Sequence, residues 1–123
     1  MQRDTDNVTP YKVGSFIEYD GHYCYISNID NSTVTLFINE GKIGTWDEAI
    51  EYCEDLGYEW ELPKHSEIPD VIKDNYTNSI WVNNYTTRTK ASALNCMSHK
   101  VTYAEKNCKY LIMSVTTVDI SAL

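Results

Sequence analysis

The residues best suited to metal chemistry are cysteines and histidines, which fall in two places along the chain. His22 and Cys24 stand two residues apart, while Cys96, His99 and Cys108 lie near the other end. Together they offer the nitrogen and sulfur ligands of a tetrahedral zinc site. However, neither place contains the Cys-x-x-Cys pair that supports such a site, and buried cysteines act more often as small apolar side chains. The sequence therefore predicts no metal ion and no cofactor.

The cysteines could also carry out thiol chemistry. Cys96 and Cys108 could serve an oxidoreductase if one of them is an exposed thiol with a low pKa. An even number of cysteines can also form disulfides in a secreted domain. The polar first residues lack the apolar run of a secretory signal, which favours free thiols. Whether Cys24, Cys53, Cys96 and Cys108 pair stays open at this point.

Other catalytic arrangements are missing from the sequence. It contains no Gly-x-Ser-x-Gly nucleophile elbow, and its three histidines have no serine or carboxylate partner at a motif spacing. The five glycines stand singly at turn positions and do not form a phosphate-binding loop. The sequence therefore predicts a protein that is not an enzyme.

Charge narrows the range of partners. The chain has 18 acidic and 10 basic residues, a formal net charge of -8, which argues against nucleic acid and anionic membranes as ligands. No apolar stretch approaches the roughly 20 residues that span a bilayer, so no membrane insertion is expected. Solvated helix faces explain most acidic stripes, but such a stripe can also occupy a basic site on another protein. The stripe here comprises Glu48, Glu51, Glu54, Asp55, Glu59 and Glu61.

The element with the clearest boundaries is a helix over residues 45–56. Thr45 and Glu48 have the spacing of a capping box, and Gly57 stands where a helix C-cap belongs. A shorter helix is predicted for Ser66–Ile72, with Pro69 in its first turn. We expect residues 1–12 to be a flexible lead-in and residues 13–123 to form one domain.

The strands are predicted from runs of aromatic and β-branched residues between turn signals. Asp20-Gly21 is a strong hairpin signal, because both turn positions need a positive φ. The turn at 28–32 leads into the next strand, and Asn83–Lys90 is expected to be a long polar loop. The expected strands are Val13–Tyr19, His22–Ile26, Thr33–Ile38, Ile80–Val82, Ser98–Tyr103 and Tyr110–Val115. Strands, two helices and further strands indicate an α+β domain.

A family resemblance rests on the middle third of the chain. Gly44–Gly57, Trp60-Glu61-Leu62-Pro63 and Glu67-Ile68 resemble the Trp-x-x-Ala-x-x-x-Cys, Trp-x-Leu-Pro and Glu-Leu string of the Lcl C-terminal domain family. That family belongs to the C-type-lectin-like and sulfatase-modifying-factor superfamily. The resemblance implies a C-type-lectin-like fold, with antiparallel sheets and two helices.

The resemblance also implies roles for particular residues. Trp46, Trp60 and Trp81 would be buried core residues, and Cys53 would pair with Cys108. The Glu-Pro-Asn loop and Trp-Asn-Asp strand of calcium-dependent sugar binders are not reproduced here, and neither is the close cysteine pair of the oxidase members. The resemblance therefore implies a scaffold without calcium-dependent sugar binding or oxidase activity.

Taken together, these expectations describe a non-enzymatic binding or structural domain. The family has many phage members, so we expect a phage virion component of the decoration or receptor-binding type. Its partner would be a protein or a cell-surface glycan, with contacts to capsid or tail proteins or to further copies of the chain. The alternative is a small acidic phage effector that inhibits a host protein. The chain would then be located in the virion or in the host cytoplasm.

Binding is expected in the polar segment 75–90, because loops on a rigid scaffold carry recognition. Tyrosine and arginine contribute most to the binding energy of protein interfaces. The candidate binding residues are therefore Tyr76, Tyr85 and Arg88.

Overall fold

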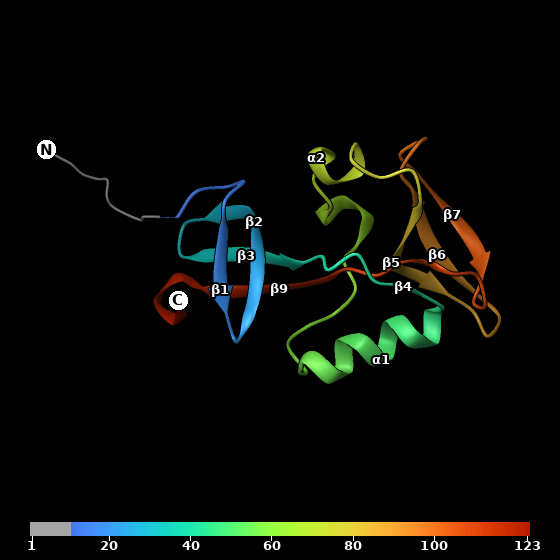
Figure 1. Cartoon of the computed structure of the whole chain (residues 1–123), viewed down its shortest axis with the longest axis horizontal. Coiled ribbons are helices and arrows are strands. Elements are labelled where there is room, and N and C mark those ends of the chain that lie inside the picture. Colours follow the sequence, from blue (N-terminus) through green and yellow to red (C-terminus); the bar gives the residue numbers. More distant parts are fainter. Residues whose placement is uncertain (1–10) are drawn as a thin grey trace, which may run out of the picture.

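A computed structural model describes residues 11–123, so most of the expected lead-in lies outside the described residues (Figure 1). Two sheets occupy opposite ends of the molecule, and helix α1 (Trp46–Leu56) lies along one side between them. The fold is mixed α+β with mostly antiparallel sheets, as expected. The lead-in was predicted to extend to residue 12, but Tyr11 already packs against the first sheet.

The first sheet has four strands in the order β1-β2-β3-β9. They are β1 (Phe16–Tyr19), β2 (His22–Asp30), β3 (Thr33–Ile38) and β9 (Ser114–Asp119). The Asp-Gly turn between β1 and β2 is confirmed, since Asp20 has a φ of 55° and Gly21 a φ of 80°. The strand β2 runs four residues further than predicted, so the next turn is shorter and contains Asn31 at a φ of 50°.

The second sheet has five strands in the order β4-β8-β5-β6-β7. They are β4 (Ile43–Gly44), β8 (Tyr110–Leu111), β5 (Ser79–Thr86), β6 (Lys90–Asn95) and β7 (Lys100–Glu105). Only the short pairing of β5 with β8 is parallel among the described strands. One strand was expected over Tyr110–Val115, but the chain leaves the second sheet after Leu111 and enters the first at Ser114.

Helix α1 begins and ends where its capping residues predict. The Glu48 amide donates to the Thr45 hydroxyl at 3.3 Å, and the Glu48 carboxylate accepts from the Thr45 amide at 2.8 Å. The Gly57 amide donates to the carbonyls of Cys53 and Glu54. Both ends of the helix therefore have partners for backbone groups that would otherwise lack them.

Removing the Thr45 hydroxyl is expected to lower the free energy of unfolding by about 1 kcal/mol, because Thr45→Ala leaves a helix amide without its acceptor. Urea unfolding followed by circular dichroism would measure the change. Thr45→Ser keeps the hydroxyl and should lose much less. Equal losses in the two variants would show that the hydroxyl does not cap the helix.

The second helix was predicted as one element over Ser66–Ile72, and this is wrong. The structure has a 3-10 turn, η2 (His65–Glu67), followed by the short helix α2 (Asp70–Lys73). Pro69 explains the break, because a proline disfavours helical backbone at the residue before it. Ile68 accordingly has extended backbone, with φ -85° and ψ 117°.

The expected loop Asn83–Lys90 is also wrong, because most of it forms a hairpin. The strand β5 continues to Thr86, and residues 87–89 make the turn into β6. The turn is closed by the Thr87 amide, which donates to the Lys90 carbonyl at 2.7 Å. The Ser92 hydroxyl accepts from the Tyr85 amide at 2.9 Å, so a buried side chain holds this irregular part of the strand.

Strand β6 was not predicted, and β7 lies two residues beyond the predicted Ser98–Tyr103. All three tryptophans are buried, which confirms the prediction for them. Trp46 and Trp81 pack edge to face between α1 and the second sheet, with ring centroids 5.6 Å apart. Trp60 packs against the first sheet.

Candidate ligand-binding cleft

A cleft of about 320 Å³ lies between the β1–β2 hairpin and helix α2. We call it the aromatic cleft, and its lining residues are Phe16, Tyr23, Tyr25, Phe37, Asn39, Val71, Ile72, Asn75 and Tyr76. A concave, largely apolar pocket with a few convergent polar groups is the usual form of a ligand site. Its aromatic lining and its few amide and phenol groups make it the candidate binding site.

One wall of the aromatic cleft is formed by side chains on a single face of the β1–β2 hairpin. Side chains two residues apart share a face of a strand, and the register pairs Phe16 with Tyr25 and Glu18 with Tyr23. Tyr23, Tyr25 and Phe16 therefore line the cleft, while Cys24 and Ile26 turn to the opposite face and join the core.

The aromatic rings of this wall contact one another. Phe16 and Tyr23 are stacked with centroids 4.9 Å apart and planes 8° apart, and Tyr25 meets Phe16 edge-on at 5.3 Å. Phe16 is 51% exposed and Tyr23 is 69% exposed. The stacked pair thus offers a ring surface to solvent.

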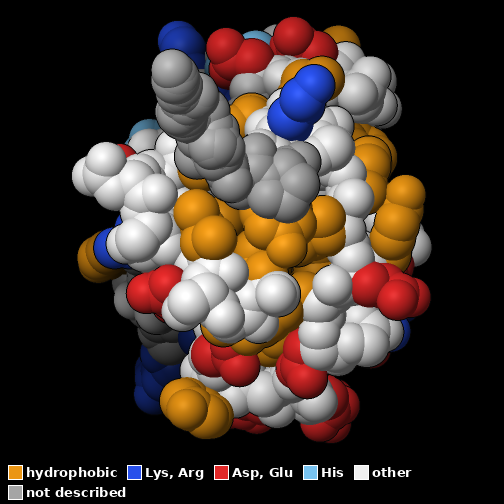
Figure 2. Space-filling view, turned by 90° about the vertical axis from the view of Figure 1, so that its left-hand side faces the viewer, with side chains coloured by type: hydrophobic (Ala, Val, Ile, Leu, Met, Phe, Trp, Pro, Cys, Tyr) orange, Lys and Arg blue, Asp and Glu red, His pale blue; other side chains and the backbone are white. Residues whose placement is uncertain are grey.

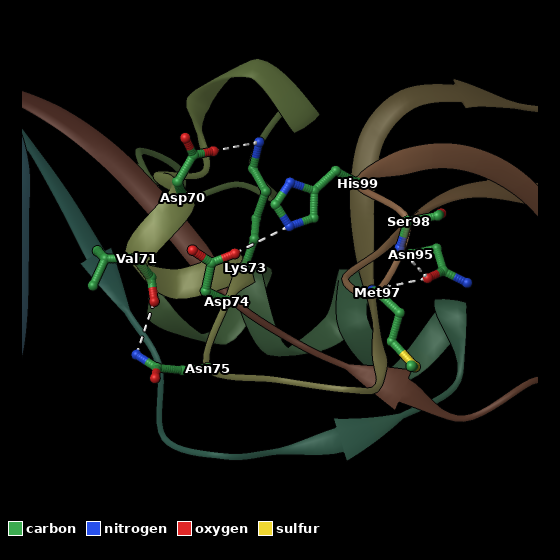
Figure 3. A network of polar contacts seen from close by, with 9 residues as sticks. All are labelled: Asp70, Val71, Lys73, Asp74, Asn75, Asn95, Met97, Ser98 and His99. Carbon is green, nitrogen blue, oxygen red and sulfur yellow. Dashed lines mark hydrogen bonds and ion pairs between the residues drawn. The ribbon is translucent and has the colours of Figure 1, made fainter.

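The opposite wall of the cleft is formed by α2 and the residues after it, and hydrogen bonds hold it in place. The Asn75 side-chain amide donates to the Val71 carbonyl at 2.8 Å, and the Asn39 side-chain amide donates to the Tyr76 hydroxyl. His99 Nε2 lies 3.2 Å from a carboxylate oxygen of Asp74, the residue that follows α2, so the end of α2 contacts the turn between β6 and β7 (Figure 3). The cleft wall is therefore anchored to the second sheet.

The electrostatic character of the aromatic cleft is neutral. None of the residues that line it is acidic or basic, and its polar groups are amides and phenols. This contrasts with the charge of -8 on the whole chain. Figure 2 shows the end of the molecule that carries the first sheet, where hydrophobic side chains gather at the centre and carboxylates lie around them.

The structure separates the three residues predicted to bind. Tyr76 lines the aromatic cleft, but Tyr85 and Arg88 lie on the exposed β5–β6 hairpin and do not. Tyr85 packs edge-on against Tyr103, with centroids 5.4 Å apart. The sequence analysis did not single out Phe16, Tyr23 and Tyr25, which line the cleft. The signal available was the i, i+2 spacing of Tyr23 and Tyr25 after the Asp-Gly turn, with Phe16 on the strand before it.

The cysteines and histidines weighed for zinc are dispersed. Cys24, Cys96 and Cys108 contact three different core clusters. His22 packs edge-on against Trp60, and His99 pairs with Asp74. Within residues 11–123 no three such side chains, or carboxylates, come together as metal ligands.

All four cysteines are free thiols, so the disulfide between Cys53 and Cys108 that the resemblance implied is wrong. Cys53 instead lies with its sulfur 3.0 Å from the Ser114 hydroxyl. Burial raises the pKa of Cys24 to about 11 and also raises the pKa of Cys53 and of Cys96. A redox role for Cys96 would require the opposite shift.

The carboxylates of the acidic stripe have different hydrogen-bond partners, and some have exposed positions on α1. Glu48 belongs to the capping box, where the hydrogen bond from the Thr45 amide lowers the pKa of its carboxyl. Glu59 accepts from the Tyr19 hydroxyl at 3.2 Å, and Glu61 accepts from the Asn83 side chain at 3.4 Å. The remaining carboxylates, Glu51, Glu54 and Asp55, are exposed on α1.

Within the described part of the chain, no helix is both long and apolar enough to cross a membrane. Comparison with known proteins found no family model that matches the sequence and no curated protein that matches it. The assignment of function therefore depends on the geometry above.

Proposed function

We propose that this chain is a non-enzymatic binding domain that holds part of its ligand in the aromatic cleft. The observation that carries the proposal is the stacked and exposed pair of Phe16 and Tyr23 over a preformed cavity. Aromatic rings supply large contact areas at a small cost in conformational entropy, because they have few rotatable bonds. Exposed stacked rings beside a concave surface are therefore well suited to recognition.

We also propose that the fold is C-type-lectin-like. The motif residues behave as a packing motif in support of this: Trp46 and Ala49 anchor α1 on the second sheet, and Leu62 is buried in the same cluster. The segment that follows α1 then crosses to the first sheet, where Glu61 forms a bridge with Val115. In such a fold the scaffold is separate from the recognition surface.

The family resemblance extends the proposal to a biological setting. We propose a phage virion component, of the decoration or receptor-binding type, that contacts a protein or a cell-surface glycan. Copies of the chain or capsid and tail proteins would hold it in place. The neutral cleft supports a neutral ligand, since a strongly charged one would meet no opposite charge there.

A second candidate function is supported by the outer face of α1. Asp47, Glu51, Glu54 and Asp55 are exposed there, and the last turn of the helix has no basic residue. A small effector could present this surface to a basic site on a host protein. Glu48 would contribute less than the sequence indicates, because its carboxylate is engaged in the capping box.

Small-molecule probes test the location of the site without knowledge of the ligand. Phenol and acetamide, added separately to ¹⁵N-labelled protein, should shift the amide signals of residues around the aromatic cleft more than those elsewhere. Phenol reports on ring stacking, and acetamide reports on the amides of Asn39 and Asn75. The variant Tyr23→Ala should reduce the phenol shifts, because it removes half of the stacked pair.

Tyr103→Ala is the matched control, since Tyr103 is an exposed strand tyrosine with its own ring contact in the other sheet. It should leave the shifts at the cleft unchanged. Phenol shifts that concentrate at Tyr85 and Tyr103 would contradict the proposed site and would support the sequence-based choice of Tyr85 and Arg88.

A further inference from the structure

Strand β7 forms the outer edge of the second sheet, on the side away from the first sheet (Figure 1). Among the described strands it pairs only with β6, and that pairing runs through six residues without a bulge. A strand at the edge of a sheet presents a row of backbone N–H and C=O groups that have no partner in the sheet. The edge of β7 is therefore a surface to which another strand can be added.

The backbone groups at this edge can be assigned from the hydrogen bonds to β6. Along an antiparallel pair, residues that bond to the partner strand alternate with residues that do not. The Lys106 amide donates to the Thr89 carbonyl at 3.0 Å, which continues the register of β6 and β7 by one pair. The residues of β7 with even numbers therefore bond to β6, and Val101 and Tyr103 direct their N–H and C=O groups away from the sheet.

Strand β7 lacks the features that usually protect a sheet edge. Protected edges are short, are interrupted by a proline or a bulge, or are covered by another element. The six residues of β7 include no proline, and Thr102 and Tyr103 at its middle are exposed. Its charged residues, Lys100 and Glu105, stand at its two ends and cancel, although the whole chain has a net charge of -8. The middle of the edge is thus both open and neutral.

A second copy of the chain fits this edge in one register. Two copies that pair through β7 in antiparallel fashion are related by a two-fold axis perpendicular to the sheet, so one residue lies opposite itself. The two residues at the middle of the strand, Thr102 and Tyr103, allow the longest overlap. An axis at Tyr103 places Lys100 opposite the partner's Lys106, and like charges directly opposite are destabilising. An axis at Thr102 leaves no like charges directly opposite.

The register with the axis at Thr102 pairs side chains that suit one another. Val101 lies opposite the partner's Tyr103, where their outward backbone groups exchange both hydrogen bonds of the pair, and symmetry repeats the contact. Pairs of an aromatic with a β-branched residue and pairs of threonines are both favourable across antiparallel strands. The remaining opposite residues are Thr102 with Thr102, Lys100 with Ala104 and Glu105 with His99. The edge is therefore complementary to itself.

We propose that β7 joins two copies of the chain in antiparallel pairing about a two-fold axis at Thr102. The two five-stranded sheets become one continuous sheet across the dimer. The proposed function includes contacts between copies, and this inference assigns the surface that makes them. It does not depend on the aromatic cleft, which lies beside the first sheet. Both clefts stay open in the dimer, so two weak binding events can reinforce each other.

Sedimentation equilibrium of the unmodified chain at about 10 to 1,000 µM should show monomer and dimer in exchange, because an interface made by one strand pair is small. The variants Thr102→Glu and Thr102→Lys each place like charges at the axis, so each should weaken dimerisation about tenfold or more. An equal mixture of the two variants should restore dimerisation, because opposite charges then meet at the axis. This recovery is specific to an interface in which position 102 faces the same position of the partner.

Thr117→Glu is the matched control, because Thr117 is an exposed threonine on β9, the edge strand of the first sheet. It adds the same charge as Thr102→Glu and should dimerise like the unmodified chain. Circular dichroism spectra should show that all variants are folded. A measurement without variants uses a mixture of ¹³C-labelled and unlabelled chains, in which NMR should detect contacts between the Val101 methyl groups and the partner's Tyr103 ring.

A chain that stays monomeric over this concentration range overturns the inference, and so does a mixture of the two Thr102 variants that associates as weakly as either alone. Equal weakening by Thr117→Glu would also overturn it, since the contact would then depend on β9 or on net charge. The phenol experiment does not require a dimer. A monomer in which phenol shifts the signals around the cleft therefore leaves the proposed binding site standing, whereas phenol shifts elsewhere in a dimeric chain refute only the cleft.

Discussion

Replacing Trp81 with alanine is expected to lower the free energy of unfolding by about 3 to 5 kcal/mol, enough to unfold much of a marginally stable domain. Trp81 is 0% exposed, and its indole N–H donates to the Gly44 carbonyl at 2.9 Å. Its ring also packs against Trp46 and against Tyr110, at 5.6 and 4.9 Å between centroids. The substitution would create a cavity and leave a carbonyl without its partner.

Two further variants separate these contributions. Trp81→Phe keeps an aromatic ring but loses the hydrogen bond to Gly44, so it should cost less than the alanine variant. Tyr58→Ala removes an aromatic ring that is 101% exposed, and its effect should stay within about 0.5 kcal/mol. Urea unfolding gives all three values. A loss at Trp81 no greater than that at Tyr58 would show that the packing between α1 and the second sheet is not as described.

Alkaline pH is expected to destabilise the fold, starting near the ordinary pKa of a thiol. Burial raises the pKa of Cys24 from 9.0 to about 11, so the folded state holds this proton where the unfolded state has released it. A group that keeps its proton in the folded state makes stability fall as pH rises. The stabilisation that the protonated Cys24 thiol contributes is complete below pH 9.0 and is lost between pH 9.0 and about 11.

Several tyrosines also make the stability of the fold decrease at alkaline pH. Burial is the main cause that raises the pKa of Tyr19, Tyr52 and Tyr110, and hydrogen bonds to Glu59 and Glu40 add to the shifts of Tyr19 and Tyr52. Their ordinary value is 10.0, so they extend the loss of stability above that pH.

Thermal unfolding at a series of pH values would measure this effect. The melting temperature should fall steeply above pH 9.0, and Cys24→Ala should make the fall shallower between pH 9.0 and about 11. An identical slope in the unmodified protein and in Cys24→Ala would mean that the buried thiol does not contribute.

The parts of the fold that the sequence predicts are those fixed by local chemistry. The capping box of Thr45 and Glu48 needs only neighbouring residues, and the Asp20-Gly21 turn needs only residues that tolerate positive φ. All three tryptophans are buried, as predicted. Each of these features is independent of how distant segments meet.

The missed parts depend on contacts between distant segments. Strand β6 has small core residues, Ala91 and Ala93, that carry little strand propensity, and its neighbours β5 and β7 determine its conformation. The end of β5 is polar and exposed on both faces, so its strand character depends on hydrogen bonds to Ser92. Neither the pairing of β6 with its neighbours nor the hydrogen bonds to Ser92 can be recognised from a few consecutive residues.

The candidate cleft was only partly accessible to sequence reasoning for the same reason. Phe16 and Tyr76 line one cavity but are 60 residues apart (76 - 16) in the sequence. The choice of Tyr76 rested on its place in a polar segment, and only the fold brings it opposite the hairpin aromatics. Tyr85 and Arg88 stay a prediction for a separate surface.

The pairing of β3 with β9 has a consequence for the order in which the protein folds. Val34 and Val118 are partners in this pairing and are 84 residues apart (118 - 34). Closing so long a loop costs entropy before any contact repays it, and such topologies fold slowly. Hairpins such as β1–β2 and β5–β6 can form early, whereas β3 keeps an unpaired edge until β9 arrives. During that interval the nascent chain is exposed to edge-to-edge aggregation, and a chaperone that covers β3 would raise the yield of folded protein.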